Sequence, residues 1–295
     1  MSSFIAALLN PDMVFIRYAL FAGLISAVPF GITGSFIVVK RIGYVAGAIS
    51  HAVLAGIGFA MYVNAKYDKE VLSPMLGAFI AAVTAGIIIS FVSRYAKERE
   101  DTIIGTVWAF GMAIGLLFIH STPTYIDPMS YLFGNIQLLG SLELKLIIIL
   151  AVIVVFVVVL FYNQLLLVSY DPEFAALRGL NVYFYQVMLI MLISCTVVLM
   201  ASSVGIVMVI ALLTIPSGIA SFFTIKLWHM IIVSSIVCAV SVVSGLAFSY
   251  MLAMPSGAVI IVVCGIIYFA AMMLNAIFGI IQKNRAVGKR DQIKP

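Results

Sequence analysis

One histidine lies inside a long apolar stretch of the chain, and its imidazole is the group there that is best suited to chemistry. His51 follows Ser50 within GYVAGAISHAVLAGIGFA, a stretch that holds no carboxylate and no ammonium group. Polar groups at membrane depth are costly and usually functional. Because neutral imidazole binds divalent cations, His51 is a candidate metal ligand on a transport path. The alternative is a structural histidine that hydrogen-bonds to a neighbouring helix.

Small residues surround this histidine and would let another helix approach closely. They are Gly47, Ala48, Ala52, Ala55, Gly56 and Gly58. Such an approach would place the imidazole beside a narrow passage. Ser50 and His51 cannot form a catalytic dyad, because adjacent positions of a helix point about 100° apart.

Other patterns that carry chemistry are missing from the sequence. It contains no HExxH, GxSxG or Walker A motif and no pair of carboxylates inside an apolar run. A membrane hydrolase would therefore lack its nucleophile and base, and an ion-coupled carrier would usually need a buried carboxylate. We expect that the chain is not an enzyme and that energy for any transport comes from another protein.

A short polar segment between two apolar runs is the second candidate for function. In SYDPEFAALRGLNV, residues 169–182, Asp171 is a good N-cap, Pro172 and Glu173 suit the first helical turn, and Gly179 would end the helix. The pattern predicts a short amphipathic helix at the membrane surface. It is either a lever gripped by a soluble partner or a simple connector.

The spacing of Phe174, Leu177 and Leu180 predicts one apolar face on this helix. So short a helix cannot hold its shape alone, so the face is expected to meet a partner. The candidate residues for such coupling are Asp171, Glu173, Phe174, Ala175, Ala176, Leu177, Arg178 and Gly179.

Membrane-spanning helices must position both candidates. Of the 295 residues, 64% are apolar and 9% charged, and the mean hydropathy is +1.24, whereas a soluble domain has roughly 25% charged residues. Runs of about twenty apolar residues can cross a hydrocarbon core. The expected fold is all-α and polytopic, with eight or nine transmembrane helices near residues 13–39, 44–64, 72–95, 102–120, 143–168, 182–202, 204–223, 229–252 and 257–282.

The distribution of positive charge predicts how these helices are oriented. Residues 94–101 carry three basic side chains and are expected in the cytoplasm, whereas 121–139 carry none and are expected to form an external loop. Alternation then places 169–181 inside and leaves the side of the N-terminus open. We expect one transmembrane domain over 1–282 and a basic cytoplasmic tail over 283–295. Because this tail carries much of the positive charge, the net charge of +5 does not indicate nucleic-acid binding.

Proline and glycine interrupt two of the apolar runs. Pro29 is followed by Gly31 and Gly34, and Pro216 is followed by Gly218. These residues predict helix breaks at membrane depth, of the kind that transporters use for gating. An ordinary kink is the alternative interpretation.

Six sequence blocks in this order resemble the membrane permeases of zinc, manganese and iron ABC importers. They are GSFIVVKRIGYVAGAISHAVLAGIG (34–58), EDTIIGTVWAFGMAIGLLFI (100–119), SYLFGNI (130–136), DPEFAALRGL (171–180), VGIVMVIALLTIPSGIA (204–220) and SYMLAMPSGAVIIVV (249–263). The resemblance implies a type II ABC importer fold in a bacterial plasma membrane, with DPEFAALRGL as the coupling helix. Its implied partners are a second permease copy, identical or related, a cytoplasmic ATPase dimer, an extracytoplasmic metal-binding protein and membrane lipid.

One position departs from this family. The family commonly has an aspartate four residues before the histidine, and here that position is Gly47, after Ala46. A lone imidazole suits zinc better than manganese, because manganese prefers hard oxygen ligands. The predicted function is therefore ATP-driven import of divalent metal ions, zinc slightly favoured over manganese or iron, with ATP on the partner and no stably bound cofactor. The alternatives are a siderophore or cobalamin permease and a non-transporting membrane scaffold.

Overall fold

The computed structural model describes residues 13–69, 71–95, 100–123 and 140–291, together with Phe4 and Leu8. Its helices are α2 (Val14–Lys40), α3 (Gly43–Tyr67), α4 (Pro74–Tyr95), α5 (Glu100–His120), α7 (Ser141–Leu160), α8 (Tyr162–Tyr170), α9 (Pro172–Leu177), α10 (Val182–Val204), α11 (Ile206–Phe223), α12 (Leu227–Leu252) and α13 (Ser256–Asp291). Most of the predicted external loop lies outside the described residues.

Nine helices of the described part are long and apolar enough to cross a membrane, and only α8 and α9 are too short. The predicted all-α polytopic fold is confirmed, at the upper of the two expected helix counts. One span differs from the prediction, because the run over 143–168 forms two helices that meet at Phe161. The last helix also continues beyond the predicted boundary at residue 282, to Asp291.

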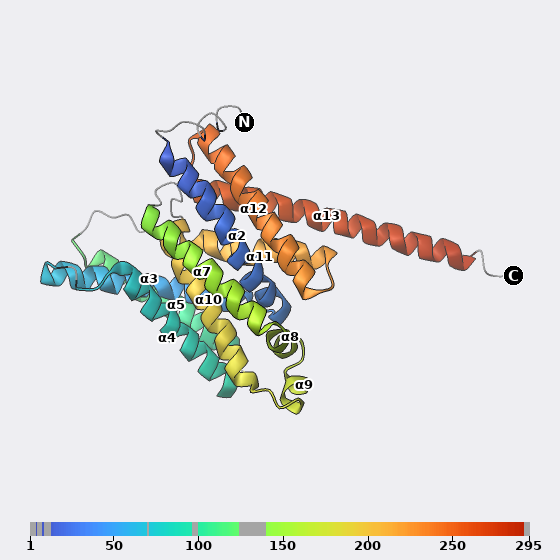
Figure 1. Ribbon diagram of the computed structural model, residues 1–295, viewed down its shortest axis with the longest axis horizontal. Helices are drawn as coiled ribbons and strands as arrows, with labels where there is room; N and C mark the ends of the chain where they lie inside the picture. Colours follow the sequence, from blue (N-terminus) through green and yellow to red (C-terminus); the bar gives the residue numbers. More distant parts are fainter. Residues whose placement is uncertain are drawn as a thin grey trace.

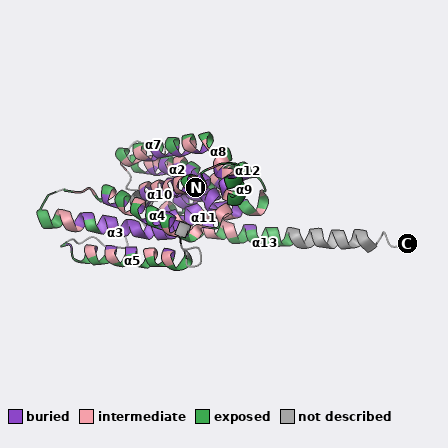
Figure 2. Ribbon diagram, turned by 90° about the horizontal axis from the view of Figure 1, so that it is seen from below, coloured by how far each residue is buried: buried purple, intermediate pink, exposed green. Residues whose placement is uncertain are grey.

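The helices form two groups that meet along α10 and α11 (Figure 1). In one group α3 packs against α4 and α5, and in the other α2 packs against α11 and α12, with α13 alongside. Helix α3 is the most enclosed of the spans, because 83% of its most apolar window is buried, against 22% for α5 and for α13. Figure 2 shows this contrast between α3 and α5.

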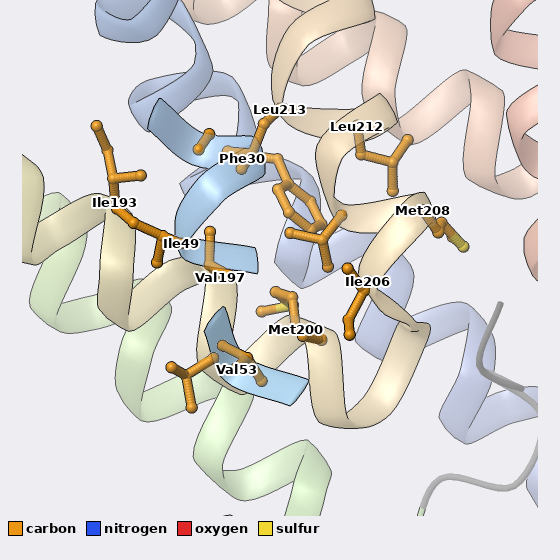
Figure 3. Close-up of a cluster of buried hydrophobic side chains, with 14 of the residues drawn as sticks. Phe30, Ile49, Val53, Ile193, Val197, Met200, Ile206, Met208, Leu212 and Leu213 are labelled. Carbon is orange, nitrogen blue, oxygen red and sulfur yellow. The ribbon is translucent and has the colours of Figure 1, made fainter. Parts of the chain in front are cut away.

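The apolar core lies where α2, α3, α10 and α11 meet (Figure 3). Phe30, Ile49, Val53, Val197 and Leu213, from these four helices, are all fully buried. On α3, Ile49 and Val53 are four positions apart and so share one face of the helix. The histidine at position 51 lies midway between them and therefore points to the opposite face of α3, away from this core.

Glycines let α3 lie directly against both of its neighbours, as the small residues around the histidine predicted. A Cβ atom on Gly56 would overlap the carbonyl oxygen of Gly77 on α4, and the reverse also holds. A Cβ atom on Gly111 of α5 would lie 2.8 Å from Cα of Ala52, and one on Gly115 would overlap the backbone of α3. The three helices therefore touch backbone to backbone.

We expect Gly56→Ala to destabilise the protein by about 1–3 kcal/mol, because the added methyl group meets a backbone carbonyl that cannot move aside. Gly105→Ala is the matched control, since a Cβ there meets no described atom within 4 Å. Alanine at that position should leave stability unchanged or raise it by up to about 1 kcal/mol. Thermal unfolding of the purified variants in detergent measures both, and equal unfolding midpoints would contradict the close packing.

Candidate functional site

His51 lies on α3 beneath α5, with 9% of its surface exposed. Its ring stacks on the indole of Trp108, with ring centroids 4.7 Å apart and planes inclined by 22°. Its Nδ1 atom is buried and has no hydrogen-bond partner among the described residues. The alternative of a histidine held by a hydrogen bond from a neighbouring helix is therefore not seen at Nδ1.

The hydroxyl group of Ser50 is used within its own helix. Its Oγ donates a hydrogen bond of 2.8 Å to the carbonyl oxygen of Ala46, one turn earlier. This geometry agrees with the inference that Ser50 and His51 are not a catalytic dyad. The imidazole Nδ1, in contrast, has no hydrogen-bond partner among the described residues.

Gly47, where the family resemblance implies an aspartate, leaves room for an aromatic ring. A Cβ atom on Gly47 would lie 2.5 Å from Cζ3 and 2.9 Å from Cη2 of Trp108. The indole therefore occupies the space into which a side chain at position 47 would point. Trp108 was not among the residues predicted from the sequence, although one signal was present: tryptophan is enriched at the two membrane surfaces, and this one lies about 12 Å inside its helix.

The described residues do not gather a full set of protein ligands around His51. No group of three His, Cys, Asp or Glu that could hold a metal ion occurs in the part of the chain that the structure describes. Helix α5 also covers the imidazole, so His51 does not lie on an open face of the chain. Its role on a transport path stays a prediction.

The predicted break in the first span is wrong, because α2 runs through Pro29 without ending. Gly31 and Gly34 serve instead as close contacts with other helices. A Cβ atom on the first would overlap Ser235 of α12, and one on the second would overlap the carbonyl oxygen of Leu213 on α11. Neighbouring helices packed this tightly hold α2 continuous, and a gating role for these residues stays untested.

The predicted break in α11 is also wrong. This helix continues through the buried Pro216 to Phe223. A Cβ atom on Gly218 would lie 3.4 Å from Cε2 of Tyr268, an ordinary contact with α13. Between Pro216 and Gly218, the hydroxyl group of Ser217 hydrogen-bonds that of Ser234 on α12, at 2.7 Å. This part of α11 is a junction between packed helices.

Residues 171–180, hereafter the coupling segment, form the predicted capped helix. The Asp171 carboxylate accepts a hydrogen bond of 2.9 Å from the backbone N–H of Phe174, and Pro172 occupies the first turn. At the other end Gly179 has a φ angle of +78°, and the backbone N–H groups of Gly179 and Leu180 donate to the carbonyl oxygens of the preceding turn. These bonds form a Schellman motif, so both ends of the helix are fixed.

Two of the three residues predicted for the apolar face of the coupling segment, Phe174 and Leu177, are exposed, and the third, Leu180, is half-buried. Leu177 is 87% exposed and Phe174 is 42% exposed, whereas Ala175 is fully buried. Ala175 packs toward the chain itself because α9 lies against α8 and α10. It was therefore wrongly placed among the residues available to a partner, while Glu173, Ala176 and Arg178 are exposed, as are the two large apolar residues.

A cavity of about 890 Å³ opens beside the coupling segment. Its walls come from α8, from the coupling segment and from the turn between α11 and α12, which Figure 1 places at one end of the helix assembly. Arg178 and Lys226 give it positive charge, and the guanidinium of Arg178 lies 5.1 Å from the centre of the Phe174 ring. Tyr162 and Trp228 add aromatic walls. This cavity could not be predicted from the sequence, because the residues that line it are far apart in the chain.

Known proteins resemble the chain over most of its length. The profile of the ABC 3 transport family matches residues 12–275. An uncharacterised membrane protein of Synechocystis is 36% identical, over 88% of this chain and 90% of that protein. The manganese transport system membrane protein MntC of Listeria monocytogenes is 34% identical, again over 88% and 90%. The structure of PsaBC from Streptococcus pneumoniae, in complex with a Fab, superimposes with a TM-score of 0.80 at 26% identity, over 92% of this chain and 94% of that one.

Proposed function

Because the chain belongs to the ABC 3 transport family, we propose that it is the membrane permease of an ATP-driven importer of divalent metal ions. The observation that carries this proposal is the similarity of nearly the whole chain to a membrane protein named for manganese transport. The fold agrees, since the described residues supply nine helices that are long and apolar enough to cross a membrane. In this proposal ATP is hydrolysed by a separate subunit, and the metal ion is cargo.

The proposed importer contains two permease copies in a bacterial plasma membrane, two cytoplasmic ATPase subunits and an extracytoplasmic metal-binding protein. Large apolar side chains on α5 and α13 support contact with lipid or with the second copy. Phe110, Leu117, Ile266 and Phe269 are each more than 60% exposed. Water-soluble monomers rarely expose contiguous apolar surface on this scale.

The coupling segment is the proposed docking site for the ATPase subunit. A rigid, doubly capped helix presents Phe174 and Leu177 outward, which suits a projection that enters a cleft in a partner. Its C-terminal residue is followed at once by Asn181, whose side-chain oxygen accepts a hydrogen bond from the N–H of Phe184 and so caps α10. A displacement of the coupling segment would therefore be passed directly to α10.

The proposed cargo is a first-row divalent transition metal ion, with zinc slightly favoured over manganese or iron. The named relative supports manganese, whereas the lone imidazole of His51 supports zinc, because manganese prefers carboxylate and other oxygen ligands. A site on a path must also bind weakly enough to release its ion. One imidazole satisfies that condition better than a full ligand set.

Growth of a strain that lacks this gene tests the proposal. In medium depleted of metals by a chelator, the deletion strain is expected to stop growing, and added zinc is expected to restore growth at a lower concentration than manganese or iron. Rescue by manganese alone would overturn the order of preference but keep the metal importer. If no metal ion rescues growth while uptake of a siderophore or of cobalamin is lost, the proposed cargo is wrong.

A further inference from the structure

The indole of Trp108 packs against α3 at Gly47, where a side chain on α3 would collide with it. Two atoms at the far edge of its indole lie within 3 Å of the position that a Cβ atom on Gly47 would take. Any other residue at position 47 would push this edge away. Because the atoms involved belong to a side chain that can rotate, the collision would move the indole and not the helices.

In this position the indole covers one face of the His51 imidazole. The two rings overlap at 4.7 Å, and only 9% of His51 is exposed. Its Nδ1 atom meanwhile has no hydrogen-bond partner among the described residues. A buried polar atom without a partner costs about 1–3 kcal/mol, so the closed arrangement is under strain that a ligand at Nδ1 would relieve.

The indole has room to rotate away from Gly47 while α5 stays in place. Gly111 and Gly115 fix α5 against the backbone of α3 on the C-terminal side of Trp108. On the N-terminal side, a Cβ atom on Gly105 would meet no described atom within 4 Å. Positions three apart lie on the same side of a helix, so this open space adjoins the indole.

We propose that Trp108 is a movable cover over His51 and thereby helps to select the cargo. Seated against Gly47, the indole hides the imidazole; rotated away, it exposes a single nitrogen ligand to a borderline divalent cation such as Zn²⁺. This inference rests on the proposed function, since it assumes that the cargo passes His51. A single imidazole without a carboxylate beside it holds Zn²⁺ more strongly than Mn²⁺.

The cover predicts how zinc binding responds when the indole is removed or displaced. If the uncovered state is populated at 10% or less, Trp108→Ala should tighten the zinc Kd at His51 at least about tenfold, because the apparent Kd scales inversely with the competent fraction. Gly47→Ala should tighten it as well, by displacing the indole. Gly43→Ala is the matched control on α3, where an added Cβ meets only a methyl group of Thr214 at 3.7 Å.

The measurement uses the permease assembled with its ATPase in lipid nanodiscs and zinc chloride as the probe. The chain has two tryptophans, and the second, Trp228, also lies beside a histidine, with its ring centroid 3.6 Å from that of His229 and the planes inclined by 39°. We therefore place all variants in a Trp228→Phe background, in which Trp108 is the only tryptophan that this chain contributes. The emission of the same complex with Trp108→Ala is subtracted as the background from the ATPase and the nanodisc scaffold. Zinc should change that emission, and His51→Ala should abolish the change. Equilibrium binding of radioactive zinc gives the Kd in the variants that lack Trp108.

Two outcomes would overturn the cover and are distinguishable from each other. If zinc uptake by the reconstituted importer requires His51 but the zinc Kd is the same in Trp108→Ala, Gly47→Ala and Gly43→Ala, the cover is wrong and the proposed function stands. If the unaltered importer neither binds nor transports zinc, manganese or iron, the proposed function fails and the cover fails with it.

Discussion

His51→Ala is expected to reduce metal uptake by the reconstituted importer to the level of liposomes without protein. In the proposed importer the imidazole is the metal ligand that α3 contributes, and no cluster of three potential ligands could replace it within the described residues. Folding should be spared, because Nδ1 makes no hydrogen bond with the described residues that alanine would lose. The lost stacking on Trp108 amounts to about 0.5–1.5 kcal/mol.

Two controls separate transport from structure in this experiment. Ser50→Ala removes a hydroxyl group that bonds only to the backbone of α3, and His120→Ala removes an exposed imidazole at the end of α5. Both variants should take up radioactive zinc normally, and all three should yield the same amount of complex by gel filtration. Normal uptake by His51→Ala would make His51 a packing residue.

The spans of the fold could be predicted because the bilayer sets the length of each apolar run. The one misjudged span shows what such a pattern hides. The apolar run over 143–168 contains Asn163 and Gln164, which line the cavity beside the coupling segment, and the chain changes from α7 to α8 just before them at Phe161. A hydropathy average hides these two amides among apolar neighbours, whereas in the structure both side chains lie in the wall of this cavity.

The proline and glycine residues were misread for a related reason. A local pattern at Pro29 or Pro216 predicts a break or a kink in the helix, but it carries no information on the neighbouring helices that pack against that turn. Gly34 illustrates this, because its missing side chain admits the carbonyl oxygen of Leu213 from another helix. Such a contact joins residues far apart in the chain and leaves no periodic signal.

The candidate site was only half predictable. The histidine could be identified because it stands out within one short stretch, and Gly47 because the family resemblance implies an aspartate at that position. The ring that fills the space at position 47 comes from α5, so the link between Gly47 and Trp108 exists only in the fold. An aspartate introduced at position 47 would therefore displace the indole as well as add a ligand, and a change in selectivity could not be assigned to the carboxylate alone.

The coupling segment was predicted well at its ends and less well on its faces. Asp171 and Gly179 cap the helix as expected, because both capping patterns are local in sequence. Which side of α9 faces outward depends on how it lies against α8 and α10, and this made Ala175 an interior residue. A charge at Ala175 would unfold the segment, so Ala175→Asp cannot test docking, whereas the exposed Ala176 and Leu177 can.

Leu177→Asp is accordingly expected to detach the ATPase from the permease or to uncouple ATP hydrolysis from metal transport. Leu177 is 87% exposed in the single chain, so aspartate there costs the permease little. In the complex the same carboxylate would be buried in an apolar contact, and we expect a loss of about 2 kcal/mol in binding, roughly a thirtyfold weaker Kd. Ala176→Asp should act in the same direction.

Leu252→Asp is the matched control for this experiment. It makes the same change at an exposed leucine, but at the far end of α12, a helix of 26 residues whose first residue, Leu227, lines the cavity beside the coupling segment. A helix of this length is about 39 Å long, so the control lies on the other side of the membrane from the coupling segment. Copurification of the ATPase and metal-stimulated ATP hydrolysis are measured for all variants. If both survive in Leu177→Asp and Ala176→Asp as they do in Leu252→Asp, the segment is a connector, because an apolar docking face could not accept a buried carboxylate without loss of binding.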